Sequence, residues 1–137
     1  MTQTVKAYLV LGICQALHSI EEIYFHLEAF SWQATGWIKA FIPIFPQLRM
    51  DAQTFAVLNI VVVTMMLAAL PFLDAGKRWA RRYARFWAVI EILNGLFHLS
   101  GVVIFSTYVP GACMAPFLLV GGIVLVGRLR RDSFKAD

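Results

Sequence analysis

The chain has 137 residues, of which 60% are hydrophobic and only 15% are charged, and its mean hydropathy is +0.71. A soluble globular domain contains about 45–50% apolar and about 25% charged residues, so this composition excludes that class. The formal net charge of +4 would suit a nucleic-acid partner, but the basic residues flank apolar segments and form no single patch. The sequence therefore predicts one transmembrane domain over residues 1–137, surrounded by membrane lipid.

Four apolar segments follow one another along the chain, and each approaches the about 20 residues that a membrane-spanning helix needs. Charged residues interrupt the second half of the first segment, whereas the second is the most uniformly apolar. We expect the spans at about Lys6–Phe30, Thr54–Leu73, Arg85–Tyr108 and Pro110–Gly127. They predict an all-α fold, as an integral membrane four-helix bundle.

Lysine and arginine are distributed very unequally between the two ends of these spans. Ten of them precede the first span, separate the second from the third, or follow the fourth, and only Lys39 and Arg49 lie on the opposite side. Cytoplasmic segments carry an excess of Lys and Arg, so we expect both termini to be cytoplasmic in a multi-pass protein of the cell inner membrane. The same residues suit anionic lipid headgroups, and no nucleic-acid partner is expected.

The connection 31–53, between the first two spans, combines large aromatic residues with two prolines. Pro43 and Pro46 exclude one long helix, and aromatic rings settle at headgroup depth on the outer side of a membrane. One interpretation is an outer interfacial aromatic loop. The other is a lid over a site that opens sideways or outward, in which Trp32 and Trp37 would contact a substrate.

Ionisable and amide side chains lie inside the predicted spans, although each ionisable group costs about 2.5–3.5 kcal/mol to insert. They are His18, Glu21, Glu22 and His26 in the first span, Asn59 in the second, and Glu91, Asn94 and His98 in the third. Steps of three or four residues place most of these side chains on one face of each helix. Their distances from the inner ends of the spans place them near the middle of the membrane. We expect one polar pocket there, with Asn59 as a substrate-binding residue.

Three short motifs in the chain resemble those of a known family. They are His18-Ser-Ile-Glu21-Glu22, Glu91-Ile-Leu-Asn94-Gly-Leu-Phe-His98 and Tyr108-Val-Pro110-Gly111. In this order, they resemble the HXXEE family of small bacterial membrane proteins, which is named for the first motif and also carries an N-x-x-x-H segment and a Pro-Gly pair. The resemblance implies a membrane protein with these signature positions, and it implies little about activity.

The first functional hypothesis is acid/base chemistry on, or binding of, an apolar lipid-like molecule such as an isoprenoid or a sterol. Burial and mutual repulsion would let one carboxyl group keep its proton at neutral pH. The catalytic set would be His18, Glu21, Glu22, Glu91, Asn94 and His98. An isomerase-type enzyme is one possibility, by analogy with sterol-isomerase-like membrane proteins.

The second hypothesis is a divalent metal cofactor. His18, Glu22, Glu91 and His98 offer two imidazoles and two carboxylates, a set that suits Fe, Mn or Zn. The two Glu-x-x-His pairs of di-iron bundles are missing from the sequence. A haem between His18 and His98 is a third alternative, and a fourth is that the polar groups only hold the helices together. The sequence leaves the ligand, the reaction and the oligomeric state open.

Overall fold

The computed structural model describes residues 1–134. The elements are α1 (Gln3–Tyr24), a short 3-10 helix η1 (Leu27–Phe30), α2 (Ser31–Phe41), α3 (Ala52–Ala68), α4 (Leu70–Asp74), α5 (Arg78–Phe105) and α6 (Ala115–Phe134). All of the regular secondary structure in this part of the chain is helical, which confirms the all-α prediction.

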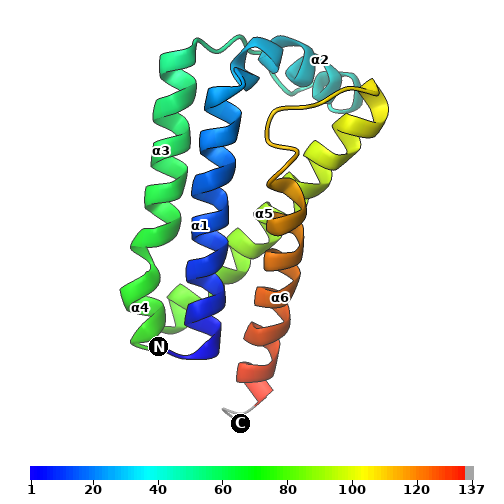
Figure 1. Ribbon diagram of the computed structural model, residues 1–137. Helices are drawn as coiled ribbons and strands as arrows, with labels where there is room; N and C mark the ends of the chain where they lie inside the picture. Colours follow the sequence, from blue (N-terminus) through cyan, green and yellow to red (C-terminus); the bar gives the residue numbers. More distant parts are fainter. Residues whose placement is uncertain (135–137) are drawn as a thin grey trace.

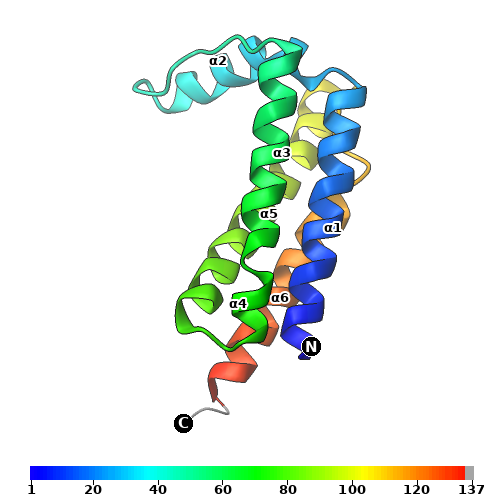
Figure 2. The same cartoon turned by 90° about the vertical axis from the view of Figure 1, so that its left-hand side faces the viewer.

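The long helices form two pairs. α1 packs beside α3, α5 packs beside α6, and α1 also contacts α6. α5 is tilted against the other helices (Figure 1), and α2 projects sideways from the bundle (Figure 2). The N-terminus and the end of α6 lie at the same end of the molecule, and α2 lies at the other, as Figure 2 also shows.

Two helical segments are long and apolar enough to cross a membrane, namely Ala52–Asp74 and Arg78–Phe105. They contain the second predicted span and most of the third. α1 and α6 do not meet the same requirement within the described residues, and polar side chains occupy part of each.

Several helices begin or end away from the expected positions. α1 ends at Tyr24 and not at Phe30, because His26 adopts a left-handed backbone conformation with φ 58°, which commonly ends a helix. α6 begins at Ala115 and not at Pro110, because Gly111 has a φ of +95°. At the opposite ends, α5 and α6 continue through the flanking arginines, which are good helix formers.

The connection 31–53 is also more regular than an extended loop. Its first part forms α2, which ends at Phe41 just before Pro43. α3 then begins directly after Asp51, whose carboxylate accepts a hydrogen bond from the Thr54 backbone N–H at 2.9 Å. This is an N-cap, and it leads the chain directly into the next helix.

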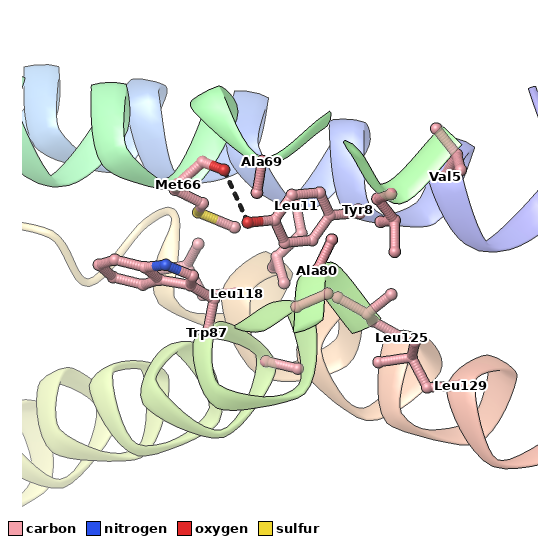
Figure 3. Close-up of a cluster of buried hydrophobic side chains, with 13 residues drawn as sticks. Val5, Tyr8, Leu11, Met66, Ala69, Ala80, Trp87, Leu118, Leu125 and Leu129 are labelled. Carbon is pink, nitrogen blue, oxygen red and sulfur yellow. Dashed lines mark hydrogen bonds between the residues drawn. The ribbon is translucent and has the colours of Figure 1, made fainter. Parts of the chain in front are cut away.

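An apolar core fills the part of the molecule near the N-terminal half of α1 (Figure 3). Tyr8 is fully buried, and its hydroxyl donates a hydrogen bond to the Met66 carbonyl at 2.6 Å, close to the interruption between α3 and α4. Leu118 and Leu125 of α6 complete this layer. The core ends after Leu11 along α1, and buried polar residues follow from Gln15 to Glu22.

Candidate functional site

Two imidazoles, one from α1 and one from α5, converge on one carboxylate oxygen of α1. His18 and Glu22 lie one helical turn apart on α1, and the tilt of α5 brings His98 against them. Glu22 Oε1 is 3.2 Å from His18 Nε2 and 3.1 Å from His98 Nε2. All three residues are buried. We call this cluster of His18, Glu22 and His98 the triad.

The two imidazoles of the triad contact each other edge to face, with ring centroids 4.7 Å apart. In a bis-histidine haem, the two rings bind from opposite faces of the porphyrin plane, which must fit between them. Here the rings are in direct contact and both point at Glu22. As the two rings lie in this structure, they leave no room for a porphyrin between His18 and His98.

Gly111 covers the imidazoles from the segment that joins α5 to α6. Its carbonyl oxygen lies 3.1 Å from His18 Nδ1. A Cβ atom added at Gly111 would lie 2.6 Å from His18 Cε1 and 2.8 Å from His98 Nδ1. Its φ of +95° is also a conformation that favours glycine. A glycine is therefore required here on two counts, backbone conformation and close approach to the rings.

The contact with Gly111 favours a proton on Nδ1 of the His18 ring. A carbonyl oxygen only accepts, so the hydrogen bond to Gly111 needs the ring hydrogen at Nδ1. The Nε2 atom of the same ring is buried and lies 3.2 Å from Glu22 Oε1. A proton or a metal ion between these two atoms makes their close approach favourable.

Glu21, the neighbour of Glu22 in the sequence, forms hydrogen bonds with the segment that joins α5 to α6. Its carboxylate accepts hydrogen bonds from the Tyr108 hydroxyl and from the backbone N–H groups of Gly111, Cys113 and Met114, the last three at 2.9–3.1 Å. These four bonds occupy most of its lone pairs. Glu21 therefore holds the segment that places Gly111 over the imidazoles.

Three other predicted site residues are not part of the triad, and one of them, Glu91, interacts with it. Glu91 of α5 is 1% exposed and interacts electrostatically with His18 and Glu22. Its Oε2 atom has no hydrogen-bond partner among the described residues. Asn94 is half-buried, and Asn59 donates a hydrogen bond to the Phe55 carbonyl of its own helix at 3.3 Å.

His26 was predicted to extend the polar face of the first span, and the structure contradicts this. It lies beyond the end of α1, is exposed, and pairs with Glu28 at 2.8 Å. Its φ of 58° turns the chain out of the helix, which removes the helical register on which the expectation depended.

Trp32 and Trp37 lie on α2 and are 43% and 44% exposed. Trp32 packs under the Arg49 guanidinium, 5.2 Å from its ring centroid. Trp37 lines an apolar cavity of about 330 Å³ between α2, the far end of α5 and the segment before Gly111. Tyr108 and Pro110 line the same cavity, so its wall continues directly into the residues that cover the triad.

The triad could hold a metal ion. One atom from each of His18, Glu22 and His98 lies within 4.8 Å of the other two. Two imidazole nitrogens and one carboxylate oxygen suit Zn, Fe or Mn. Glu91, which was predicted as a fourth ligand, is not part of this group. The contribution of Gly111 and Tyr108 was not predicted, although the Pro-Gly pair in the sequence marks the place.

The family comparison adds the identity of the chain. No curated protein and no solved structure matches it. A family model described as "Protein of unknown function with HXXEE motif" matches residues 9–125, a range that contains the triad, Glu21 and Gly111. The chain therefore belongs to the HXXEE family.

Proposed function

We propose that the chain is an integral membrane protein of four spanning helices, α1, α3–α4, α5 and α6, with both termini in the cytoplasm. The apolar surface supports this proposal, since Ile60, Val103 and Val120 on three of these helices are 63%, 78% and 59% exposed. Nine of the eleven basic residues within residues 1–134 belong to segments at the end that holds the N-terminus, as the positive-inside rule requires. The bundle would then sit in the cell inner membrane.

Within this bundle, we propose that the triad binds a divalent transition metal. The observation that carries the proposal is the close approach of three potential ligand atoms: Glu22 Oε1 lies 3.2 Å from His18 Nε2 and 3.1 Å from His98 Nε2, while the other nitrogen of His18 faces the Gly111 carbonyl. A metal ion between these atoms would bind all three side chains. The Gly111 carbonyl then has the role usual for groups around a metal site, since it accepts the other ring N–H and orients the ligand.

The distances in the triad are slightly shorter than those of an occupied tetrahedral metal site. Nitrogen and oxygen ligands lie about 2.0–2.2 Å from zinc, which places neighbouring ligand atoms of a tetrahedral site about 3.3–3.6 Å apart. The separations from Glu22 Oε1 to the two Nε2 atoms are 3.2 and 3.1 Å. Three protein ligands leave at least one coordination position for water or a substrate, as in catalytic metal sites.

The cavity next to the triad suggests which molecule the site would act on. It is lined mainly by apolar and aromatic side chains, among them Phe30, Trp37 and Ile104, and about 330 Å³ lies at the lower end of the range for small-molecule pockets. A lipid-like molecule entering from the bilayer would fit this lining. The function that the geometry supports best is therefore metal-centred chemistry on, or metal-dependent binding of, an apolar lipid-like molecule.

Cobalt titration of the detergent-purified protein tests the metal. Co²⁺ bound to imidazole and carboxylate ligands absorbs visible light, so wild type should give a saturable spectrum. Glu22→Gln and His98→Gln should lose it, whereas His26→Gln, an exposed histidine outside the triad, should keep it. Absence of a saturable spectrum in wild type would contradict the proposal.

A second candidate is metal-free acid/base chemistry on the same lipid-like molecule. In this case a proton, and not a metal, lies between His18 and Glu22, with Glu91 and Asn94 close to the triad. Glu22→Gln distinguishes the two candidates in protein isolated with its native content. The melting temperature should fall if a metal is lost, because metal binding is part of the folding free energy. It should stay unchanged or rise if only an ionisable group leaves the interior.

A further inference from the structure

A second cavity, of about 940 Å³, opens at the end of the molecule that holds the N-terminus and the end of α6. Residues from the start of α1, from the α4–α5 connection with the first turn of α5, and from the last turns of α6 line it. Thr2 and Glu22 are twenty residues apart on the same helix, so about 30 Å separates this cavity from the triad. It is therefore not part of the site described above.

The lining of this cavity is strongly basic. The charged residues that contribute to it are Arg81, Arg128, Arg130, Arg131, Asp74 and Asp132. Both aspartates are already engaged by other groups: Asp132 accepts a hydrogen bond from the Thr4 hydroxyl at 2.6 Å, and Asp74 lies 3.8 Å from the N-terminal ammonium. In residues 1–134, no guanidinium of the four lies within ion-pairing distance of a carboxylate.

The position of α1 adds to this positive potential. Its first residues line the cavity, and Thr2 caps only one of the free N–H groups, that of Val5 at 3.2 Å. The remaining amides of the first turn have no partner within the helix. They give this end of a 22-residue helix a partial positive charge that favours anions.

We infer that this cavity binds a phosphate group carried by an anionic ligand, and that the ligand is the headgroup of an anionic phospholipid. Guanidinium groups pair with phosphate oxygens through two parallel hydrogen bonds. Arg81 and Arg128 are half-buried while Arg130 and Arg131 are exposed, so the cavity is open to an incoming headgroup. The choice of a lipid rests on the proposed orientation, which places this end at the cytoplasmic headgroups. The phosphate chemistry itself does not depend on the metal.

Calorimetric titration of the full chain in an uncharged detergent tests the inference. Short-chain phosphatidylglycerol should bind saturably, and short-chain phosphatidylcholine should bind much more weakly because its headgroup carries no net charge. Saturable binding of inorganic phosphate, without phosphatidylglycerol binding, would keep the phosphate site and overturn the lipid assignment. Binding of neither would overturn the inference as a whole.

A matched pair of variants separates the cavity from general attraction between charges. Arg81→Gln with Arg128→Gln removes two charges from the lining, and Arg82→Gln with Arg85→Gln removes two charges that lie outside it. The first pair should weaken phosphatidylglycerol binding by about tenfold or more, since hydrogen bonds to charged groups are lost, and the second pair should change it little. Equal weakening by both would overturn the inference. If the double variant of Arg81 and Arg128 does not fold, Arg130→Gln takes its place in the same comparison, because Arg130 is an exposed residue of the lining.

Discussion

At the scale of the residue, Gly111 is the position where backbone conformation and the two imidazoles depend on each other. Gly111→Ala should lower metal affinity by about 10–100-fold, the usual effect of disturbing groups that orient metal ligands, because its Cβ would overlap His18 and His98. The matched control is Gly76→Ala. Gly76 also has a positive φ, of 70°, but nothing lies within 4 Å of an added Cβ.

Both alanine variants should therefore share the backbone strain, about 1–2 kcal/mol, and only Gly111→Ala should lose metal affinity. Cobalt titration and thermal melting of the two proteins measure the two effects separately. Equal metal affinity in both variants would show that Gly111 does not determine the position of the imidazoles.

Glu21 and Glu22 are adjacent in the sequence, yet we expect their substitutions to have different effects. Glu21→Gln should lower the free energy of unfolding by about 2 kcal/mol, because a carboxylate that accepts three backbone N–H bonds is replaced by an amide. Glu28→Gln, which affects only the pair with exposed His26, is the control, and should have a much smaller effect. Denaturation in the same detergent measures both, and a Glu21→Gln protein as stable as wild type would exclude the structural role.

The sequence predicted that His18, Glu22 and His98 lie close together, and the structure brings them together, but the contacts of Glu21 could not be predicted. His18, Glu22 and His98 follow from helical spacing and depth, which are properties of the sequence. Glu21 points about 100° away from Glu22 around α1, and only the path of the segment 106–114 determines what it contacts. His26 was misassigned because one left-handed residue ends a helix, and no hydrophobic pattern indicates that.

At the scale of the element, the close contact between α5 and α6 depends on glycine. A Cβ on Gly95 would lie 2.7 Å from the Ala115 carbonyl oxygen and 3.0 Å from the Leu119 nitrogen, both backbone atoms that cannot rotate away. Gly95→Ala should therefore separate the helices and lower the free energy of unfolding by about 1–3 kcal/mol. Gly127→Ala, with nothing within 4 Å, should be neutral or stabilise α6 by about 0.5–1 kcal/mol.

Thermal melting of the two variants side by side checks this prediction. A Gly95→Ala protein that melts with wild type or above it would mean that α5 and α6 pack less closely than the distances indicate.

The helices themselves could be predicted from hydrophobicity more reliably than their ends. The apolar segments predicted the position of each long helix, because a helix that packs in a core or lies in a membrane needs a run of apolar residues. Arg78 and the arginines of α6 continue their helices past the apolar segments, because arginine is a good helix former although it is not apolar. α2 was not expected, because the prolines that exclude a long helix leave room for the shorter one that ends at Phe41.

At the scale of the whole molecule, the proposed orientation makes a simple prediction. Reporter fusions after Asp51, the N-cap residue just before α3 at the α2 end, and after Asp137, the last residue, should report opposite sides of the membrane. The reason is the concentration of basic residues at the other end. Alkaline phosphatase and a fluorescent protein fused at each position measure the two sides independently. The same side for both fusions would refute the topology.

The central claim is the metal bound by the triad, and elemental analysis of the protein isolated from membranes tests it most directly. Wild type should carry about one Zn, Fe or Mn ion per chain. Glu91→Gln, which alters another buried carboxyl, outside the triad, should carry the same amount. Glu22→Gln and His98→Gln should carry almost none. A wild-type protein without metal, or variants of the triad that retain as much metal as wild type, would contradict the account.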